Sequence, residues 1–455
     1  MTRDFHIEIS NQSFKVQVPS HLDAVLKKYK YLIHTYTSYS SNNNNSSSLR
    51  LYPLCSAFGE KLRLYCPCNL DLIRTLEVAE ERYWIPHVWK LHYIMTVIYR
   101  ARWNKATEEG DFAPLSSKIL ETVIGSHFAG PAKAVLLKLA IIETDNHYVV
   151  GEKCKGYRFR EPFQSAKFME VKPPIPARIV KRMQYLTKLK ARTDKLEHFF
   201  LSENLKKVTL DAGVERFFLT FEPKNDFQAD YYERSVEWIQ NKDWFFCYDE
   251  KTGRVFNNIT SFPKNLRPFL RLDGSPLVEI DVANCQPFLL LGLYKSEPER
   301  EEYQQVVENG QFYEALDSEL ENPFGADRRK ELKQAVFTQV FFDRIRQNPS
   351  KLCRAFARRF PVLFQRIQDL KHPHYRNCAL WLQKQEADIV IDGVIKNIAR
   401  GEGFPVLTVH DSVLTLPECV ESVEELLESE FQNRFGIAPR LNRKDYTGEC
   451  ASIAR

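Results

Sequence analysis

The sequence predicts an α+β fold in which a mainly helical first half precedes a mixed second half. In the second half, short β-branched runs and longer helical stretches follow one another without the strict alternation of a βαβ fold. At 455 residues, with 44% hydrophobic and 27% charged residues, the chain is typical of a globular protein with two or three domains. Its net charge is only +5, so any nucleic-acid surface has to be local.

Cysteine usage and the first residues indicate a cytoplasmic protein. The ten cysteines follow no repeating pattern, and the Cys66-Pro-Cys68 pair lacks the spacing of a structural zinc site. The chain starts with polar and charged residues, without the apolar segment of a signal peptide. No apolar run approaches the roughly 18–20 residues that cross a bilayer, so we expect no membrane contact.

The first region, residues 1–48, combines a hairpin with a low-complexity stretch. Phe5–Val18 alternates apolar and polar residues around Asn11-Gln12, which predicts two short antiparallel strands. Ser38–Ser48 is nearly all Ser and Asn and has too little apolar area to order itself, so we expect a flexible connection there.

The second region, residues 49–165, begins with an aromatic helical stretch, Arg74–Arg102. Its histidines His87 and His92 are five residues apart and therefore do not share one helical face. We expect a packed aromatic core here rather than a metal site.

A second pattern in this region is that of a winged helix. Two helical segments, Ser117–Ile124 and Pro131–Ala140, precede two strand-like pieces, His147–Val150 and Gly156–Phe159, which bracket a basic turn. Such a wing can lie along a phosphate backbone. The same pattern also suits a small module that serves only protein packing, and both interpretations stay open.

The third region, residues 166–243, contains a basic linker and then a thumb-like helical part. Lys167–Lys195 holds nine Lys or Arg residues against two acids, Glu170 and Asp194, and prolines interrupt its start. This run is either a solvated face or a contact to a nucleic-acid backbone.

The fourth region, residues 244–455, mixes strands and helices. Two of the predicted strands, Trp244–Tyr248 and Arg254–Phe256, flank a turn, and a third is followed at once by a helix that starts near Pro287. The further predicted elements are the strands Leu277–Ile280, Val406–Val409 and Ser412–Leu416 and the helices Gln286–Tyr294, Asp327–Gln347 and Ala379–Arg400.

Two aspartates stand at strand ends in this region. Asp281 ends the strand Leu277–Ile280, and Asp411 lies at the tip of the tight hairpin between Val406–Val409 and Ser412–Leu416. Each could be an ordinary cap or turn residue. If the strands are neighbours in one sheet, however, the two carboxylates can share a pair of Mg²⁺ ions that act on a phosphoryl group.

A helix downstream has the residue types of a nucleotide site. Arg329, Lys333, Phe337 and Phe341 recur every four residues and are expected on one face. Cations can hold a triphosphate while a ring packs on the base or sugar. The alternative is an amphipathic helix whose cations extend their stems over apolar surface.

Five segments in this order resemble family A (DNA polymerase I-like) polymerases. The helix from Arg329 to Phe341 resembles their fingers helix, and Leu277–Leu290 and Val409–Val413 resemble their motifs A and C. The Thr-Gly-Arg ending at Arg254 and the stretch Gln383–Asp388 also match. The resemblance spans about Trp244–Pro417 and does not reach the first 200 residues. It implies a right-hand polymerase palm, an antiparallel sheet with helices, and reduced helical fingers at about residues 300–380.

The resemblance implies a role for each matching residue. Asp281, Asp411 and the backbone carbonyl of Val282 would hold two Mg²⁺ ions, with Mn²⁺ as an alternative. The incoming triphosphate would contact Arg329 and Lys333, and Lys333 would act as general acid toward pyrophosphate. The remaining contacts would be Phe337 on the incoming nucleotide, Phe341 beside the templating base, and Arg254, Gln383 and His410 near the primer end. The partners would be a template–primer nucleic acid, nucleoside triphosphates and a replication partner of the N-terminal region.

Three departures from the family leave the sugar of the substrate open. Gln286 replaces the Glu that blocks the ribose 2′-hydroxyl, Phe342 replaces the expected Gly, and Ser412 follows Asp411 as in phage-type single-subunit RNA polymerases. No upstream segment resembles a 3′–5′ exonuclease. The sequence therefore predicts a DNA polymerase without proofreading. The alternatives are an RNA polymerase or primase-like enzyme, and an inactive relative that acts as a nucleic-acid-binding replication factor.

Overall fold

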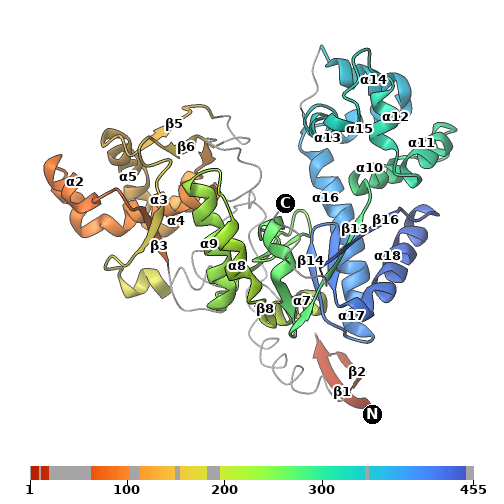
Figure 1. Cartoon of the computed structure of the whole chain (residues 1–455), viewed down its shortest axis with the longest axis horizontal. Coiled ribbons are helices and arrows are strands. Elements are labelled where there is room, and N and C mark those ends of the chain that lie inside the picture. Colours follow the sequence, from red (N-terminus) through yellow and green to blue (C-terminus); the bar gives the residue numbers. More distant parts are fainter. Residues whose placement is uncertain are drawn as a thin grey trace. The chain divides into compact units, whose positions relative to one another are not determined.

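The structure is a computed structural model of the chain, shown in Figure 1. It describes the backbone of residues 2–9 and 12–19, and residues 63–102, 112–148, 154–181, 195–343 and 348–446. Residues 1–49 and 50–455 form two separate compact units.

The first unit holds the predicted hairpin, which is confirmed. Strands β1 (Thr2–Ile9) and β2 (Gln12–Pro19) pair antiparallel, with Ile9 opposite Gln12 across the turn. The expected flexible stretch Ser38–Ser48 lies outside the described residues.

The second unit begins with a helical module whose core is aromatic, as predicted. Helix α3 is buried on nearly every side, and Trp84 and Trp89 pack in the same core. Burial lowers the pKa of His92 to about 4, so this side chain is neutral, and His87 packs against Phe128. Among the described residues, no group of three or more His, Cys, Asp or Glu could hold a metal ion. The elements are β3 (Leu64–Pro67), α2 (Leu72–Val78), η2 (Arg82–His87), α3 (Val88–Ala101), α4 (Ser117–Ile124) and α5 (Ser126–Lys138).

A three-stranded antiparallel sheet completes this module, in the order β4-β6-β5. The strand expected at His147–Val150 is wrong in its described part, because β5 forms earlier, at Ile142–Thr144. The reason is Asp145, whose Oδ1 accepts the backbone N–H groups of His147 and Gly156 and so turns the chain away from the sheet. Helix α5 also starts before Pro131, directly after Gly125. The strands are β4 (Ala113–Pro114), β5 (Ile142–Thr144), β6 (Gly156–Phe159) and, paired with β3, β7 (Phe168–Val171).

A group of helices connects this module to the C-terminal part. Asp230 in α9 bonds Tyr99 of α3, and Arg234 donates to the carbonyl of Phe168 at 2.7 Å. The basic stretch Lys167–Lys195 is described only as far as residue 181 and at residue 195. The elements are α7 (Leu196–Lys206), β8 (Val208–Leu210), α8 (Gly213–Thr220) and α9 (Asp226–Gln240).

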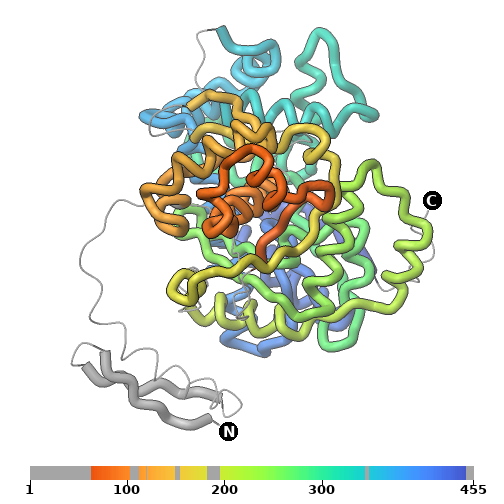
Figure 2. Tube along the Cα trace, turned by 90° about the vertical axis from the view of Figure 1, so that its left-hand side faces the viewer, coloured from red at the N-terminus to blue at the C-terminus, as the bar shows by residue number. Residues whose placement is uncertain are grey.

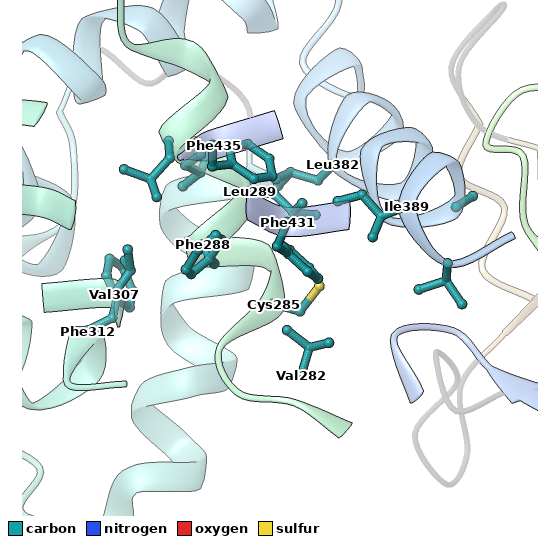
Figure 3. Close-up of a cluster of buried hydrophobic side chains, with 14 of the residues drawn as sticks. Val282, Cys285, Phe288, Leu289, Val307, Phe312, Leu382, Ile389, Phe431 and Phe435 are labelled. Carbon is teal, nitrogen blue, oxygen red and sulfur yellow. The ribbon is translucent and has the colours of Figure 1, made fainter. Parts of the chain in front are cut away.

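The C-terminal part contains an antiparallel sheet in the order β14-β15-β13-β16. Strands far apart in the sequence are therefore neighbours, and Asp281 on β13 lies opposite Ser412 on β15 and Asn442 on β16. Helices α10, α16 and α18 pack in the core cluster of Figure 3, which holds Cys285 and Phe288. The sheet and its helices are β13 (Val278–Val282), α10 (Cys285–Leu289), η4 (Leu290–Leu293), α16 (Asn377–Ile389), the π-helix η7 (Val390–Ile395), α17 (Lys396–Arg400), β14 (Val406–Val409), β15 (Ser412–Thr415), η8 (Pro417–Cys419), α18 (Val420–Phe435) and β16 (Leu441–Asp445).

Smaller elements precede this sheet, and a helical subdomain is inserted between β13 and β14. The trace of the second unit can be followed from orange to blue in Figure 2. The smaller elements are β9 (Phe246–Tyr248), β10 (Val255–Asn257), η3 (Lys264–Phe269), β11 (Leu270–Leu272) and β12 (Ser275–Pro276). The inserted helices, besides α16, are α11 (Glu299–Glu308), α12 (Phe312–Asp317), η5 (Ala326–Arg328), α13 (Arg329–Ala335), the π-helix η6 (Val336–Phe341), α14 (Lys351–Arg359) and α15 (Pro361–Lys371).

Across the described ranges, which leave gaps before residue 63 and after residue 446, no helix has the length and apolar character to span a bilayer.

Candidate active site

A cavity of about 710 Å³ lies where β13, the β14–β15 hairpin, α10 and α13 meet. Most of the residues predicted for the site line it. They are Arg254, Asp281, Val282, Gln286, Arg329, Lys333, Phe337, His410 and Asp411. Gln383 and Phe341 are not part of the lining.

The sheet register positions the two aspartates. Asp281 lies opposite Ser412, whose hydroxyl donates a hydrogen bond of 2.8 Å to Asp281 Oδ1. Asp411 directly precedes Ser412, in the two-residue loop that joins β14 to β15. The first loop residue, His410, has φ of +60°, a conformation that costs a non-glycine residue about 1–2 kcal/mol. The hairpin therefore holds Asp411 next to the end of β13 at some cost in backbone strain.

Two neighbouring carboxylates in the cavity disfavour the ionised form of Asp411. Burial, the neighbouring Glu386 carboxylate and then Asp281 raise the pKa of Asp411 to about 7, and Lys333 acts in the opposite direction. A carboxyl group so placed gains stability in its ionised form from any cation that enters the cavity.

This donor set fits a hard divalent cation. Two carboxylates and the carbonyl of Val282 are oxygen ligands, which Mg²⁺ prefers, and Mg²⁺ usually takes only one or two carboxylates and completes its shell with water and phosphate oxygens.

Helix α13 brings two cations and one ring to the opposite side of the cavity. Arg329 donates to Glu314 at 2.6 Å and lies over the ring of Tyr313. Lys333 has no ion-pair partner among the described residues, and its Nζ is 5.9 Å from the ring centroid of Phe337. These side chains repeat every four residues, so they share one face as the sequence indicated.

The four-residue repeat ends at Phe337, because α13 continues as the π-helix η6. The N–H of Phe342 bonds the carbonyl of Phe337, five residues back, and Lys371 donates to the carbonyl of Val340 at 2.6 Å. The wider turns rotate Phe341 into the core, where its side chain is 0% exposed. Burying a phenylalanine contributes about 1.5–3 kcal/mol, which favours this arrangement.

One buried acid in the cavity was not predicted. Glu386 on α16 is 2% exposed and forms an ion pair of 2.6 Å with Arg254. The sequence held a signal for it, because Leu382, Glu386 and Ile389 recur at helical spacing and place this acid on the buried face of α16.

Sequence analysis also missed a second basic wall, which we call the palm-edge wall. It consists of residues from η3, the chain before β16 and β16 itself: Lys264, Arg440, Asn442 and Lys444. Asn442 is the direct cross-strand neighbour of Asp281. No sequence pattern marked these residues, because their proximity to Asp281 depends on the pairing of β16 with β13.

Comparison with known proteins found a similar solved structure. No family model and no curated protein matches the chain. The solved structure is the polymerase domain of Pol1 from M. smegmatis in complex with a DNA primer-template and a dNTP, with 14% identity and a TM-score of 0.37. The match covers 52% of this chain and 56% of that one.

Proposed function

We propose that the chain is a template-directed nucleotidyl transferase, a DNA polymerase that extends a primer with deoxynucleoside triphosphates. The observation that carries this proposal is the meeting of Asp281, Asp411 and Lys333 in one cavity, although they come from three distant segments. Two acids and a cation around one open cavity suit a phosphoryl transfer, because the acids would hold metal ions and the cation would contact the phosphates.

The reaction forms a bond between the primer 3′ oxygen and the α-phosphorus of the nucleotide, and pyrophosphate leaves. Two Mg²⁺ ions held by Asp281, Asp411 and the Val282 carbonyl would supply the positive charge at the attacking and leaving oxygens. Arg329 and Lys333 bind the triphosphate, and Lys333 donates a proton to the leaving pyrophosphate oxygen. Phe337 packs on the incoming nucleotide, which orients it for attack.

The primer end lies on the palm side of the cavity in this proposal. Arg254 and His410 contact the terminal base pair, and the palm-edge wall binds strand phosphates beyond it. Gln383 on α16 and Phe341 in the core contribute only if the bound nucleic acid or the fingers move toward them. A 3′–5′ exonuclease is not part of the proposed activity, and the module of α3–β6 would bind template or a replication partner.

Primer extension tests the proposal. Purified chain with Mg²⁺ and a labelled primer–template should add deoxynucleotides to the primer, and the Asp411→Asn variant should not. Absence of extension by the wild-type chain with both deoxynucleotides and ribonucleotides would overturn the proposal and favour the inactive relative.

A second candidate is an RNA polymerase or primase-like enzyme of the same superfamily. The observation that favours it is Ser412, which follows Asp411 and bonds Asp281, together with Gln286 in the cavity lining. Strong ribonucleotide incorporation without a primer, in a parallel reaction, would select this candidate over the first.

A further inference from the structure

The ion pair between Arg254 and Glu386 is far more buried than the Arg329–Glu314 pair at the same cavity. Its side chains are only 14% and 2% exposed, whereas Arg329 and its partner Glu314 are about half exposed. A pair of this kind, removed from water, holds its geometry and is weakly screened by salt.

Three elements fix this pair. Arg254 follows Gly253, whose φ of +70° belongs to the β9–β10 turn, and a Cβ at Gly253 would lie 3.1 Å from Ala387 Cβ. The turn therefore packs directly on α16, one residue beyond Glu386. From the third element, α10, the Gln286 side chain favours the ionised form of Glu386 and opposes the rise in its pKa that burial causes.

The carboxylate of this pair is not saturated, unlike that of the Arg267–Glu279 pair in the same cavity wall, whereas the Nε atoms of both arginines lack a hydrogen-bond partner among the described residues. Both carboxylate oxygens of Glu279 accept hydrogen bonds from the protein. By contrast, Glu386 Oε1, Arg254 Nε and Gln286 Oε1 are buried without a hydrogen-bond partner in the described part of the chain. Of these three atoms Arg254 Nε is the donor, so an acceptor on a ligand can supply its missing contact, whereas the two oxygens need water or a ligand donor.

We propose that Glu386 is a positioning residue that balances the charge of Arg254. As a result, the Arg254 guanidinium donates hydrogen bonds to uncharged acceptors on the terminal base pair and does not bind a phosphate. A guanidinium paired with a buried carboxylate keeps its other N–H donors, and the pair as a whole has no net charge to attract phosphate. Base edges in the minor groove offer such acceptors in every base pair. The inference rests on the proposed function, because it assigns the ligand of that site.

Salt dependence and mismatch discrimination test this role together. In Glu386→Gln the freed charge of Arg254 should bind phosphate, so the dependence of log affinity for primer–template on log salt should steepen by about 1. Extension from a mismatched primer end should at the same time improve about tenfold relative to a matched end. Arg254→Ala should lose the same discrimination without the steeper slope, and the double variant should behave like Arg254→Ala.

Asp388→Asn is the matched control, because Asp388 lies on the same helix, pairs with Lys384 and does not line the cavity. This variant should change neither the salt dependence of primer–template affinity nor the discrimination against a mismatched primer end. Glu386→Asp keeps the charge, so it should retain the wild-type salt slope, and it serves if Glu386→Gln does not fold. An unchanged slope in Glu386→Gln, with matched and mismatched extension reduced equally, would overturn the role of Glu386. A wild-type chain inactive in extension would instead overturn the proposed function.

Discussion

Two acids on strand β13, only two residues apart, have opposite surroundings. Glu279 accepts hydrogen bonds from Arg267, Lys444 and Tyr446. Asp281 accepts one, from Ser412, within the described residues. Burial would raise the pKa of Glu279, but Arg267, Tyr446 and Lys444 lower it, whereas the pKa of Asp411 beside Asp281 is raised to about 7.

The difference distinguishes Glu279, whose partners are within the protein, from the two acids to which the proposed function assigns metal binding. Glu279 is neutralised by the protein itself, so its charge stabilises the fold and is not available to a ligand. Among the described residues Asp411 lacks such donors, and a bound cation would favour its ionised form. Burial alone would not distinguish the two, but counting the donors around each carboxylate does.

In the proposed function Lys333 binds the substrate, and it lines the same cavity as Asp281 and Asp411 without an ion-pair partner of its own among the described residues. Lys333→Met should lower kcat for extension about 10²–10³-fold, because a triphosphate contact and a proton donor are both lost. Single-turnover extension measures this. Lys351→Met, which removes an exposed cation paired with Glu321, is the control and should extend at the wild-type rate.

Removing the structural acid should cost stability. Glu279→Gln leaves Arg267 buried without its carboxylate, so we expect the free energy of unfolding to fall by about 3–5 kcal/mol. Urea titration measures this change. A loss below about 1 kcal/mol would contradict the structural assignment of Glu279.

Removing Asp411 should raise the free energy of unfolding in the absence of metal, which is opposite to the decrease expected for Glu279→Gln. Because the pKa of folded Asp411 is raised above its unfolded value, the folded state binds more protons between about pH 4 and 7, and this group stabilises the fold increasingly as pH falls through that window. Asp411→Asn should therefore gain on the order of 1–2 kcal/mol at pH 8 in EDTA and no longer show this pH dependence. Thermal melts at pH 5 and pH 8 measure both. A variant less stable than wild type at pH 8 would refute this view.

The smallest expected effect is that of a substitution in the palm-edge wall on the affinity for primer–template. Lys264→Gln removes one cation from this wall, so affinity for primer–template should fall a few-fold and the salt slope should flatten by about 1. Fluorescence anisotropy over a salt series measures both. Lys295→Gln, an exposed cation outside the cavity, should leave both values unchanged.

Much of the site was predictable because its chemistry lies in short local patterns. The hairpin tip at Asp411 and the four-residue spacing of Arg329 and Lys333 each appear in the sequence at their structural positions, and the strand predicted to end at Asp281 extends one residue further, to Val282. Their proximity depended on the assumption that β13 and β15 pair, and this pairing is observed.

The rest depended on packing that local patterns do not encode. The π-helix that withdraws Phe341 requires Lys371 from another helix, and the ion pair of Glu386 requires the β9–β10 turn to pack on α16. Strand β5 forms earlier than expected because a side-chain turn at Asp145 ends it.

The central claim, that Asp281 and Asp411 act as one unit, is tested most directly by single-turnover primer extension in Mg²⁺ with Asp281→Asn, Asp411→Asn and the double variant. Each single variant should lose at least about 10³-fold in rate, and the double variant should lose little more than the slower single one, because residues that act together are not additive. Extension by either single variant at the wild-type rate would contradict the claim.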